Sequence, residues 1–237
     1  MDHRTETFGG YVETEINKDP IRETPLTVWM TIHQPSELNY WKGKISRFDN
    51  NDFYLARLKD FKGHPPLDFT AYKGKLVVDM GSGPRSICEF FEGADVVCIE
   101  PLAEEFRKIN NGAYDKPMIK AVIPQPAEGF ISKLAMRADL VWCNNVLDHC
   151  FNWRSVLMNI ARYLRPGGDF FIALDNDPPH AGHPGIGDMD ELIRTMTDLN
   201  LFFNYFYMRK PTDPDGTLTK LTFMYRSGFK NNPEIWK

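Results

Sequence analysis

The chain has 237 residues, of which 42% are hydrophobic and 13% aromatic. That length suffices for one sizeable core with a small cap, and it excludes two full domains. The formal net charge is −4. A mildly acidic chain lacks the broad basic surface of proteins that bind nucleic acid backbones, so we expect no nucleic acid partner.

The four cysteines include no pair with CxxC spacing. We expect reduced and mostly buried thiols, as in a cytosolic protein. No stretch approaches the ~20 consecutive apolar residues of a membrane span, and the polar N-terminus lacks the apolar core of a signal peptide. The sequence therefore predicts a cytoplasmic protein with no membrane partner, and it leaves the oligomeric state open.

The first part of the chain is irregular. Residues 1–25 are polar and predict a loose arm, whereas Leu26–Phe61 is aromatic without the alternation of a strand. Pro35 to Glu37 is typical of a helix start, so we expect short helices that cap a core. The predicted division is an N-terminal arm and helical cap over residues 1–70 and a main domain over residues 71–237.

Beyond Tyr72, short apolar runs alternate with helical segments. The predicted strands are Lys75–Met80, Ala94–Ile99, Met118–Val122, Leu140–Asn144 and Asp169–Leu174. The predicted helices are Ser86–Phe91, Ala103–Ile109, Glu128–Leu134, Trp153–Leu164 and Asp188–Leu199. Nearly continuous apolar strands separated by helices indicate a parallel sheet with both faces covered.

Two aromatic runs, Leu201–Arg209 and Leu218–Arg226, follow the last predicted helix. The connection between them holds two prolines and an Asp-Gly pair, which favours a hairpin over a crossover. The expected fold is a doubly wound α/β sheet, mostly parallel and seven-stranded, that ends in an antiparallel hairpin and carries a small helical N-terminal cap.

The most informative segment is KLVVDMGSGPRS, residues 75–86. Gly81 and Gly83 follow an apolar strand and allow a sharp turn with close approach of the backbone to a ligand. Amides at the start of a following helix would receive a carboxylate or phosphate. Glu100 ends the next predicted strand, where an acid accepts hydrogen bonds from ribose hydroxyls. Together these features predict nucleotide binding.

The acid before the glycines indicates which nucleotide. A dinucleotide fingerprint needs a third glycine where Arg85 and Ser86 stand. Asp79 would repel a pyrophosphate but would favour an ammonium group, directly or through water. The ligand should carry a cation at that end, which suits the amino acid half of S-adenosylmethionine.

Four segments resemble motifs of one family, the class I S-adenosylmethionine-dependent methyltransferases. Val77–Pro84 resembles the first motif of that family, and Val97–Pro101 resembles its second-strand acid motif. Ala138–His149 is similar to the fourth-strand motif, and Leu164–Phe171 is similar to the turn into the fifth strand. The motifs occur in the family's order, with one departure at Arg85, where the family often has another glycine.

The resemblance implies S-adenosyl-L-methionine as the cofactor and assigns its contacts to the strand ends. The loop from Gly81 to Gly83 would face the methionine moiety, Glu100 would bind the ribose, and Asn144 would bind the methionine amino group. Pro101 and Leu102 would flank the adenine. The implied cofactor residues are Asp79, Gly81, Ser82, Gly83, Glu100, Pro101, Leu102, Ala127, Glu128 and Asn144.

Ala127 and Glu128 have two interpretations. They resemble the segment that contacts the adenine edge in the family. They would also suit an ordinary helix N-terminus with a favourable acid.

Methyl transfer requires an aligned acceptor and, for an alcohol or phenol, removal of its proton. His149 follows the fourth strand on the edge where such sheets hold ligands, and imidazole titrates near neutrality. His149 is therefore the candidate base, with Asp148 orienting the substrate or the ring. The alternative is that His149 begins a helix and only packs or contacts the cofactor.

A second polar cluster follows the fifth strand. Asp175 and Asn176 resemble the metal-binding pair of catechol-type O-methyltransferases, but Asn144 stands where a magnesium site needs a further oxygen ligand, ordinarily an acid. We therefore predict no metal. His180 and His183, in the proline-rich loop beyond, are candidates for contact with the substrate.

The aromatic segment around Tyr40, Trp41 and Arg47 would close over the site or pack in the core, and the core is the commoner place for such residues. The sequence as a whole predicts a methyltransferase that acts on a small-molecule or sugar-like acceptor at oxygen. One alternative is a protein or nucleic-acid methyltransferase, although the Asn-Pro-Pro-Tyr motif of base methyltransferases is missing at Asn144. Another is a non-catalytic cofactor-binding subunit with the same fold.

Overall fold

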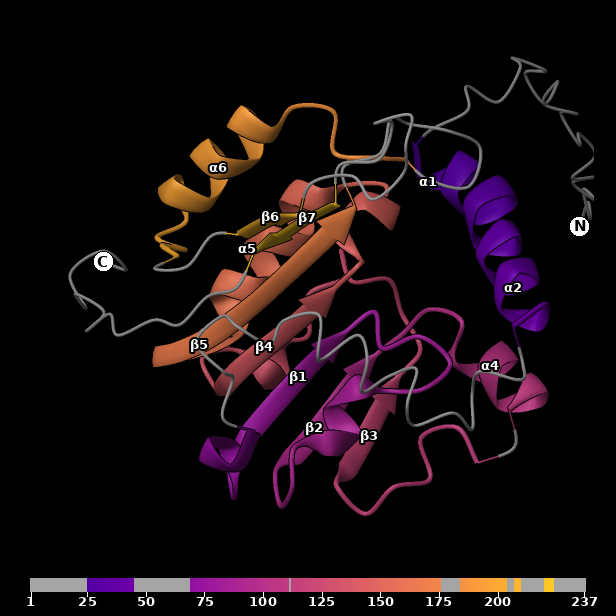
Figure 1. Cartoon of the computed structure of the whole chain (residues 1–237), viewed down its shortest axis with the longest axis horizontal. Coiled ribbons are helices and arrows are strands. Elements are labelled where there is room, and N and C mark those ends of the chain that lie inside the picture. The colour runs from indigo at the N-terminus through magenta and orange to yellow at the C-terminus, as the bar shows by residue number, and fades with distance from the viewer. Residues whose placement is uncertain are drawn as a thin grey trace, which may run out of the picture.

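The computed structural model describes residues 25–44, 69–110, 112–175, 184–203, 207–209 and 220–223. Its centre is a sheet in the order β3-β2-β1-β4-β5-β7-β6 (Figure 1). The parallel strands are β1 (Leu76–Met80), β2 (Asp95–Ile99), β3 (Ile119–Ile123), β4 (Ala138–Asn144) and β5 (Leu164–Asp175). These five strands confirm the predicted α/β fold with a parallel sheet.

Two short strands continue the sheet beyond β5. Strand β7 (Lys220–Phe223) pairs antiparallel with β5 and with β6 (Tyr207–Arg209). Residues 210–219, which join β6 to β7, lie outside the described residues. The hairpin ending of a seven-stranded sheet therefore stays a prediction.

Successive side chains point to opposite sides of a sheet. Strands β1 and β4 and most of β2 and β5 are buried on both faces, whereas β3 is only partly buried. On β1, Val78 and Met80 join the core beside α5 (Trp153–Tyr163) and α6 (Met189–Asp198). Val77 joins the opposite core, around Phe91. This double burial explains why the sequence shows continuous apolar runs instead of alternation.

Three predicted helices occur close to their expected ranges. Helix α4 spans Ala103–Ile109 as predicted. Helix α5 begins after Asn152, whose side chain accepts a hydrogen bond from the amide of Ser155, and α6 begins after Asp188 in the same way. Such side-chain caps satisfy amides that the first helical turn leaves without partners.

Two predicted helices are wrong, because each shrinks to a single 3-10 turn. Ser86–Phe91 contains only η4 (Ile87–Phe90), and Glu128–Leu134 contains only η5 (Ser132–Leu134). In the second segment the Tyr163 hydroxyl accepts from the amide of Ile131 and donates to the carbonyl of Gly129. Backbone groups that a helix would pair internally are thus bound by a side chain instead.

The N-terminal cap is one continuous helical rod that begins earlier than predicted. It starts at Pro25 as α1 (Pro25–Val28), passes through a π-helical turn η1 (Trp29–His33) and ends as α2 (Gln34–Lys42). Pro35 is therefore inside the rod and not at its start. Proline lacks an amide and its ring clashes with the preceding turn, and the wider π turn accommodates it.

The rod lies at the edge toward which the parallel strands point, and α2 contacts α4 (Figure 1). The predicted domain boundary at residue 70 adjoins residues 45–68, which the structure does not describe, and it stays a prediction. Within the described ranges, no helix combines the length and apolar character needed to cross a membrane.

We predict that Phe171→Ala destabilises the fold by about 3–5 kcal/mol, the usual cost of truncating a buried aromatic residue. Phe171 is fully buried on β5 and stacks on Trp142 of β4, with 3.9 Å between the ring centroids. Urea unfolding followed by circular dichroism measures the loss. Phe202→Ala, at a ring that is 37% exposed, is the control, and equal losses in both variants would contradict this account of the core.

Candidate active site

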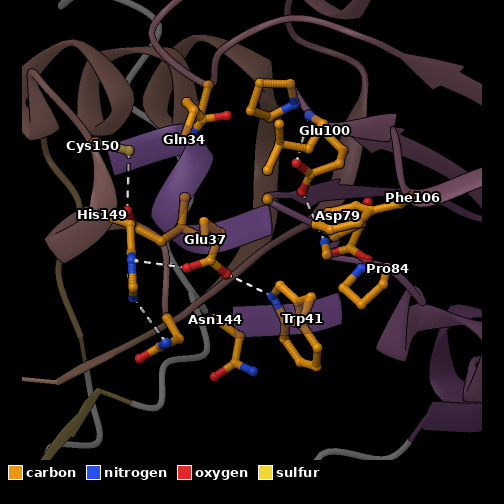
Figure 2. Close-up of a pocket in the computed structure, with 18 of the residues that line it drawn as sticks. Gln34, Glu37, Trp41, Asp79, Pro84, Glu100, Phe106, Asn144, His149 and Cys150 are labelled. Atoms are coloured by element: carbon orange, nitrogen blue, oxygen red, sulfur yellow. Dashed lines mark hydrogen bonds and ion pairs between the residues drawn. The ribbon is translucent and has the colours of Figure 1, made fainter. Parts of the chain in front are cut away.

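A cavity opens where the loops after β1, β2 and β4 meet the N-terminal rod (Figure 2). It lies at the carboxyl edge of the parallel strands, where open α/β sheets bind ligands. The lining residues are Trp29, Gln34, Glu37, Trp41, Asp79, Gly81, Ser82, Gly83, Pro84, Arg85, Ile87, Glu100, Pro101, Leu102, Phe106, Ala127, Glu128, Trp142, Asn144, Asn145, Val146, His149 and Cys150. All ten residues that the sequence predicted to contact the cofactor are among them.

The loop after β1 requires its glycines for two different reasons. Gly81 has φ 64° and Gly83 has φ 66°, in the left-handed region that other residues rarely adopt. A Cβ atom on Gly81 would also lie 2.4 Å from Cγ2 of Val146, whereas a Cβ on Gly83 would meet nothing within 4 Å. Gly81 thus lets β1 and the β4 loop approach, and Gly83 leaves open space beside the cavity.

Glu100 holds this loop in place. One carboxylate oxygen accepts from the amide of Gly83 at 2.9 Å, and the other accepts from the amide of Leu102 at 2.9 Å. The side chain is almost fully buried, and that burial raises the pKa of Glu100 to about 7. The helix expected after this loop is replaced by η4. The amide of Gly83 donates to the Glu100 carboxylate, so it is already bound within the protein.

Asp79 lies beneath the same loop. Its carboxylate accepts a hydrogen bond from the Ser86 hydroxyl at 2.5 Å, and burial raises the pKa of Asp79 to about 7. Asp79 lines the cavity, so its predicted role toward an ammonium group stays open to test.

The predicted adenine side is formed by Pro101, Leu102, Ala127 and Glu128. Glu128 accepts a hydrogen bond from the amide of Asn152, and burial raises the pKa of its carboxyl group. The helix N-terminus interpretation is wrong at this position, because no α-helix starts at Glu128.

His149 lies in η6 (Leu147–His149), just beyond the end of β4. Its Nε2 is 3.2 Å from Nδ2 of Asn145, and its Nδ1 is 3.7 Å from Oε2 of Glu37. If the Asn145 amide donates, the imidazole proton is on Nδ1 and faces Glu37. Asp148 does not line the cavity. It is fully buried and accepts from the amide of Asp175, with its Oδ2 3.7 Å from Nε2 of His149.

The sequence missed the contribution of the rod to the cavity. Trp29, Gln34 and Glu37 line it, and so does Trp41, one of the residues suggested for closure. Tyr40 is 51% exposed, and Arg47 lies outside the described residues. The Trp29 indole donates to the carbonyl of His149 at 2.7 Å. The helix start predicted at Pro35 was the available signal for the rod. The sequence could not show where the rod packs, because Trp29 binds His149, which is 120 positions away.

Four buried polar atoms that belong to lining residues have no hydrogen-bond partner among the described residues: Gln34 Oε1, Ser82 Oγ, Glu128 Oε2 and Trp142 Nε1. A buried polar atom without a partner costs about 1–3 kcal/mol. The cavity therefore fits a polar ligand that supplies both hydrogen-bond donors and acceptors, as S-adenosylmethionine does.

Most of the second polar cluster follows Asp175, the last described residue of β5. Asn176, His180 and His183 lie outside the described residues, so their predicted roles stay predictions. In the described part of the chain, no group of three His, Cys, Asp or Glu side chains is arranged to hold a metal ion.

Residues 54–206 match the model of a methyltransferase domain family. The chain belongs to this family. The match confirms the resemblance that the four motifs carry.

Curated relatives match this chain over part of their length. A ubiquinone biosynthesis O-methyltransferase of Erwinia tasmaniensis is 30% identical over 105 residues, which are 44% of this chain and 43% of that protein. The same enzyme of Escherichia coli is 29% identical over 105 residues, 44% of each chain. The match thus spans less than half the length of these relatives.

Solved structures share the fold at low sequence identity. The geranyl diphosphate C-methyltransferase of Streptomyces coelicolor, in complex with Mg²⁺, geranyl-S-thiolodiphosphate and S-adenosyl-L-homocysteine, has a TM-score of 0.54 at 14% identity and covers 73% of this chain and 76% of its own. A complex of a Haloferax volcanii methyltransferase activator and a methyltransferase gives a TM-score of 0.53 at 15% identity, covering 80% of this chain and 98% of the matched one.

We predict that Gly81→Ala destabilises the protein more than Gly83→Ala does. Both variants force a left-handed residue, at roughly 1–2 kcal/mol, and only Gly81→Ala adds the clash with Val146. In urea unfolding, adding Val146→Ala to Gly81→Ala should give a smaller total loss than the two single losses added together. Simple additivity would show that the approach of Val146 is not what position 81 requires.

Proposed function

We propose that this methyltransferase uses S-adenosylmethionine to methylate a small-molecule or sugar-like acceptor at a hydroxyl oxygen. The observation that carries the proposal is one cavity that joins the glycine loop, Glu100 and His149. When bound, S-adenosylmethionine supplies the activated methyl group. The remaining tasks belong to the chain: to bind the cofactor, to align the acceptor and to take its proton.

The cofactor contacts follow the strand ends. The backbone from Gly81 to Gly83 faces the methionine part, with Asp79 near its ammonium group. Glu100 accepts from the ribose hydroxyls with lone pairs that its two backbone hydrogen bonds leave available. Pro101, Leu102, Ala127 and Glu128 surround the adenine, and Asn144 holds the methionine amino group.

His149 takes the acceptor proton in this proposal. The Nε2 atom gives up its contact with Asn145 when the acceptor hydroxyl is in place, and Nδ1 keeps facing Glu37. Asp148 supports the ring from the buried side. His180 and His183, which follow β5 in the sequence, are proposed to contact the acceptor.

The test of the function as a whole has two steps. Calorimetry with S-adenosylmethionine establishes cofactor binding, and formation of S-adenosylhomocysteine across a panel of hydroxyl acceptors establishes turnover. Binding without turnover on any acceptor would favour a non-catalytic subunit. Turnover confined to protein or nucleic acid acceptors would favour the other alternative.

Two further parts of the proposal rest on the sequence. The cytoplasmic location and the lack of a nucleic acid or membrane partner follow from composition. The Haloferax complex pairs a methyltransferase with an activator protein, so a gel-filtration profile of the purified chain belongs beside the assay.

We predict that Glu100→Ala weakens S-adenosylmethionine binding by about 1.5–3 kcal/mol, the range for hydrogen bonds to a charged group. Calorimetry measures the affinity, and circular dichroism checks that the fold is retained. Glu92→Ala, at an exposed acid before β2, is the control and should bind as the wild type does. Unchanged affinity in Glu100→Ala would mean that another acid binds the ribose.

We predict that His149→Ala lowers kcat by ~100-fold to 10,000-fold, the usual effect of removing a general base. The affinity for S-adenosylmethionine should barely change, because the imidazole serves the acceptor. His149→Gln keeps a polar side chain without a base and should lose as much. Activity within a few-fold of the wild type in either variant would make His149 structural and turn attention to His180 and His183.

A further inference from the structure

The cavity carries an imbalance of charge, and one of its acids has no part in the proposed cofactor contacts. Its lining includes four acids: Glu37, Asp79, Glu100 and Glu128. The basic residues are Arg85 and His149, and the Arg85 guanidinium pairs with Glu89, both being largely buried. A ligand with positive charge therefore gains more in this cavity than a neutral ligand of the same shape.

Glu37 is the member of this set that comes from the cap. Its Oε1 accepts from the Trp41 indole at 2.6 Å, and its Oε2 is 3.7 Å from Nδ1 of His149. Burial is the main cause of the raised pKa of Glu100, and the negative charge of Glu37 raises that pKa further. In Figure 2, the Glu37 carboxylate lies between His149 and Trp41, with a dashed line to each.

If the proposed function holds, Glu37 lies in the cavity in which the methyl group is transferred. The methyl group must move from a cofactor whose ribose lies at Glu100 to an acceptor whose proton is taken by His149. The reacting centre therefore lies between these two residues, in the cavity that Glu37 also lines. The second indication of a ligand here is the Ser82 hydroxyl, which lines the same cavity, is 7% exposed and has no hydrogen-bond partner among the described residues.

We propose that Glu37 recognises the positive charge at the reacting centre of the cofactor, so that the cap holds S-adenosylmethionine in preference to its neutral product. This rests on the proposed function. In the transfer, the carbon–sulfur bond breaks and its electron pair stays on sulfur, while the acceptor oxygen forms the new bond to carbon. The acceptor proton passes to His149. Glu37 then faces a neutral product on one side and a protonated imidazole on the other.

The test compares three ligands that differ at one position: S-adenosylmethionine, with a sulfonium; sinefungin, with an amine-bearing carbon there; and S-adenosylhomocysteine, with a neutral thioether. Calorimetry gives the affinity of each for the wild type and for Glu37→Gln. The glutamine keeps the size of the side chain and an oxygen for Trp41. We expect the two cationic ligands to weaken roughly tenfold, about 1.4 kcal/mol, and the neutral one to change less than about twofold.

Two controls separate charge from packing. Trp41→Phe removes the hydrogen bond that holds Glu37 but leaves its charge, and it should weaken all three ligands alike. Glu104→Gln removes an exposed acid of α4 that pairs with Arg107 outside the cavity, and it should change none of them.

The outcomes are distinct. Equal weakening of all three ligands by Glu37→Gln would make Glu37 a structural residue of the cap and would overturn the inference. Unchanged affinities would overturn it as well. If the wild type bound none of the three, the proposed function would fail, and the inference with it.

Discussion

The carboxylate of Glu100 joins the two loops on which the cavity is built. It is buried at the end of β2, and it binds the amide of Gly83 from the β1 loop and the amide of Leu102 from the start of α4. The position of β2 beside β1 in the parallel register brings these groups together. Burial raises the pKa of Glu100 to about 7, and the two backbone donors partly offset the cost of a charge at this depth. The same acid that shapes the empty site is thus the one proposed to hold the ribose.

The cap depends on a second set of contacts at the opposite side of the cavity. Trp29 is anchored to the carbonyl of His149 and packs edge-on against Phe151, with 5.3 Å between the ring centroids. At the other end of the rod, Trp41 packs with Phe106 of α4. The rod therefore spans from the β4 loop to α4. The contacts by which it borders the cavity also hold the backbone at His149.

Much of the fold was predictable because burial on both faces gives strands a continuous apolar signature. Helix α4 was also predicted correctly over Ala103–Ile109. Where the sequence failed, long-range contacts decided the outcome: Tyr163 binds the backbone of 129–131, and Ser86 binds Asp79 where a helix was expected. The motifs predicted residues that line the cavity because parallel strands end on one edge. Glu37 and Gln34 have no such pattern, since their place at the cavity is set by how the rod packs.

Because two acids are buried at the ligand-free site, the stability of the folded protein depends on pH. The pKa of Asp79 rises from an ordinary value of 3.8 to about 7, and that of Glu100 rises from 4.5 to about 7. Between those values the folded protein binds more protons than the unfolded chain. The stability that comes from the protonated acids is therefore present at low pH and lost as the pH rises through about 7. A ligand that brings positive charge to Asp79 and hydroxyl donors to Glu100 stabilises their ionised forms, and binding offsets that loss. The excess of acidic groups lowers the stability of the ligand-free protein above neutral pH. The same groups are thus a source of affinity for a cationic nucleotide.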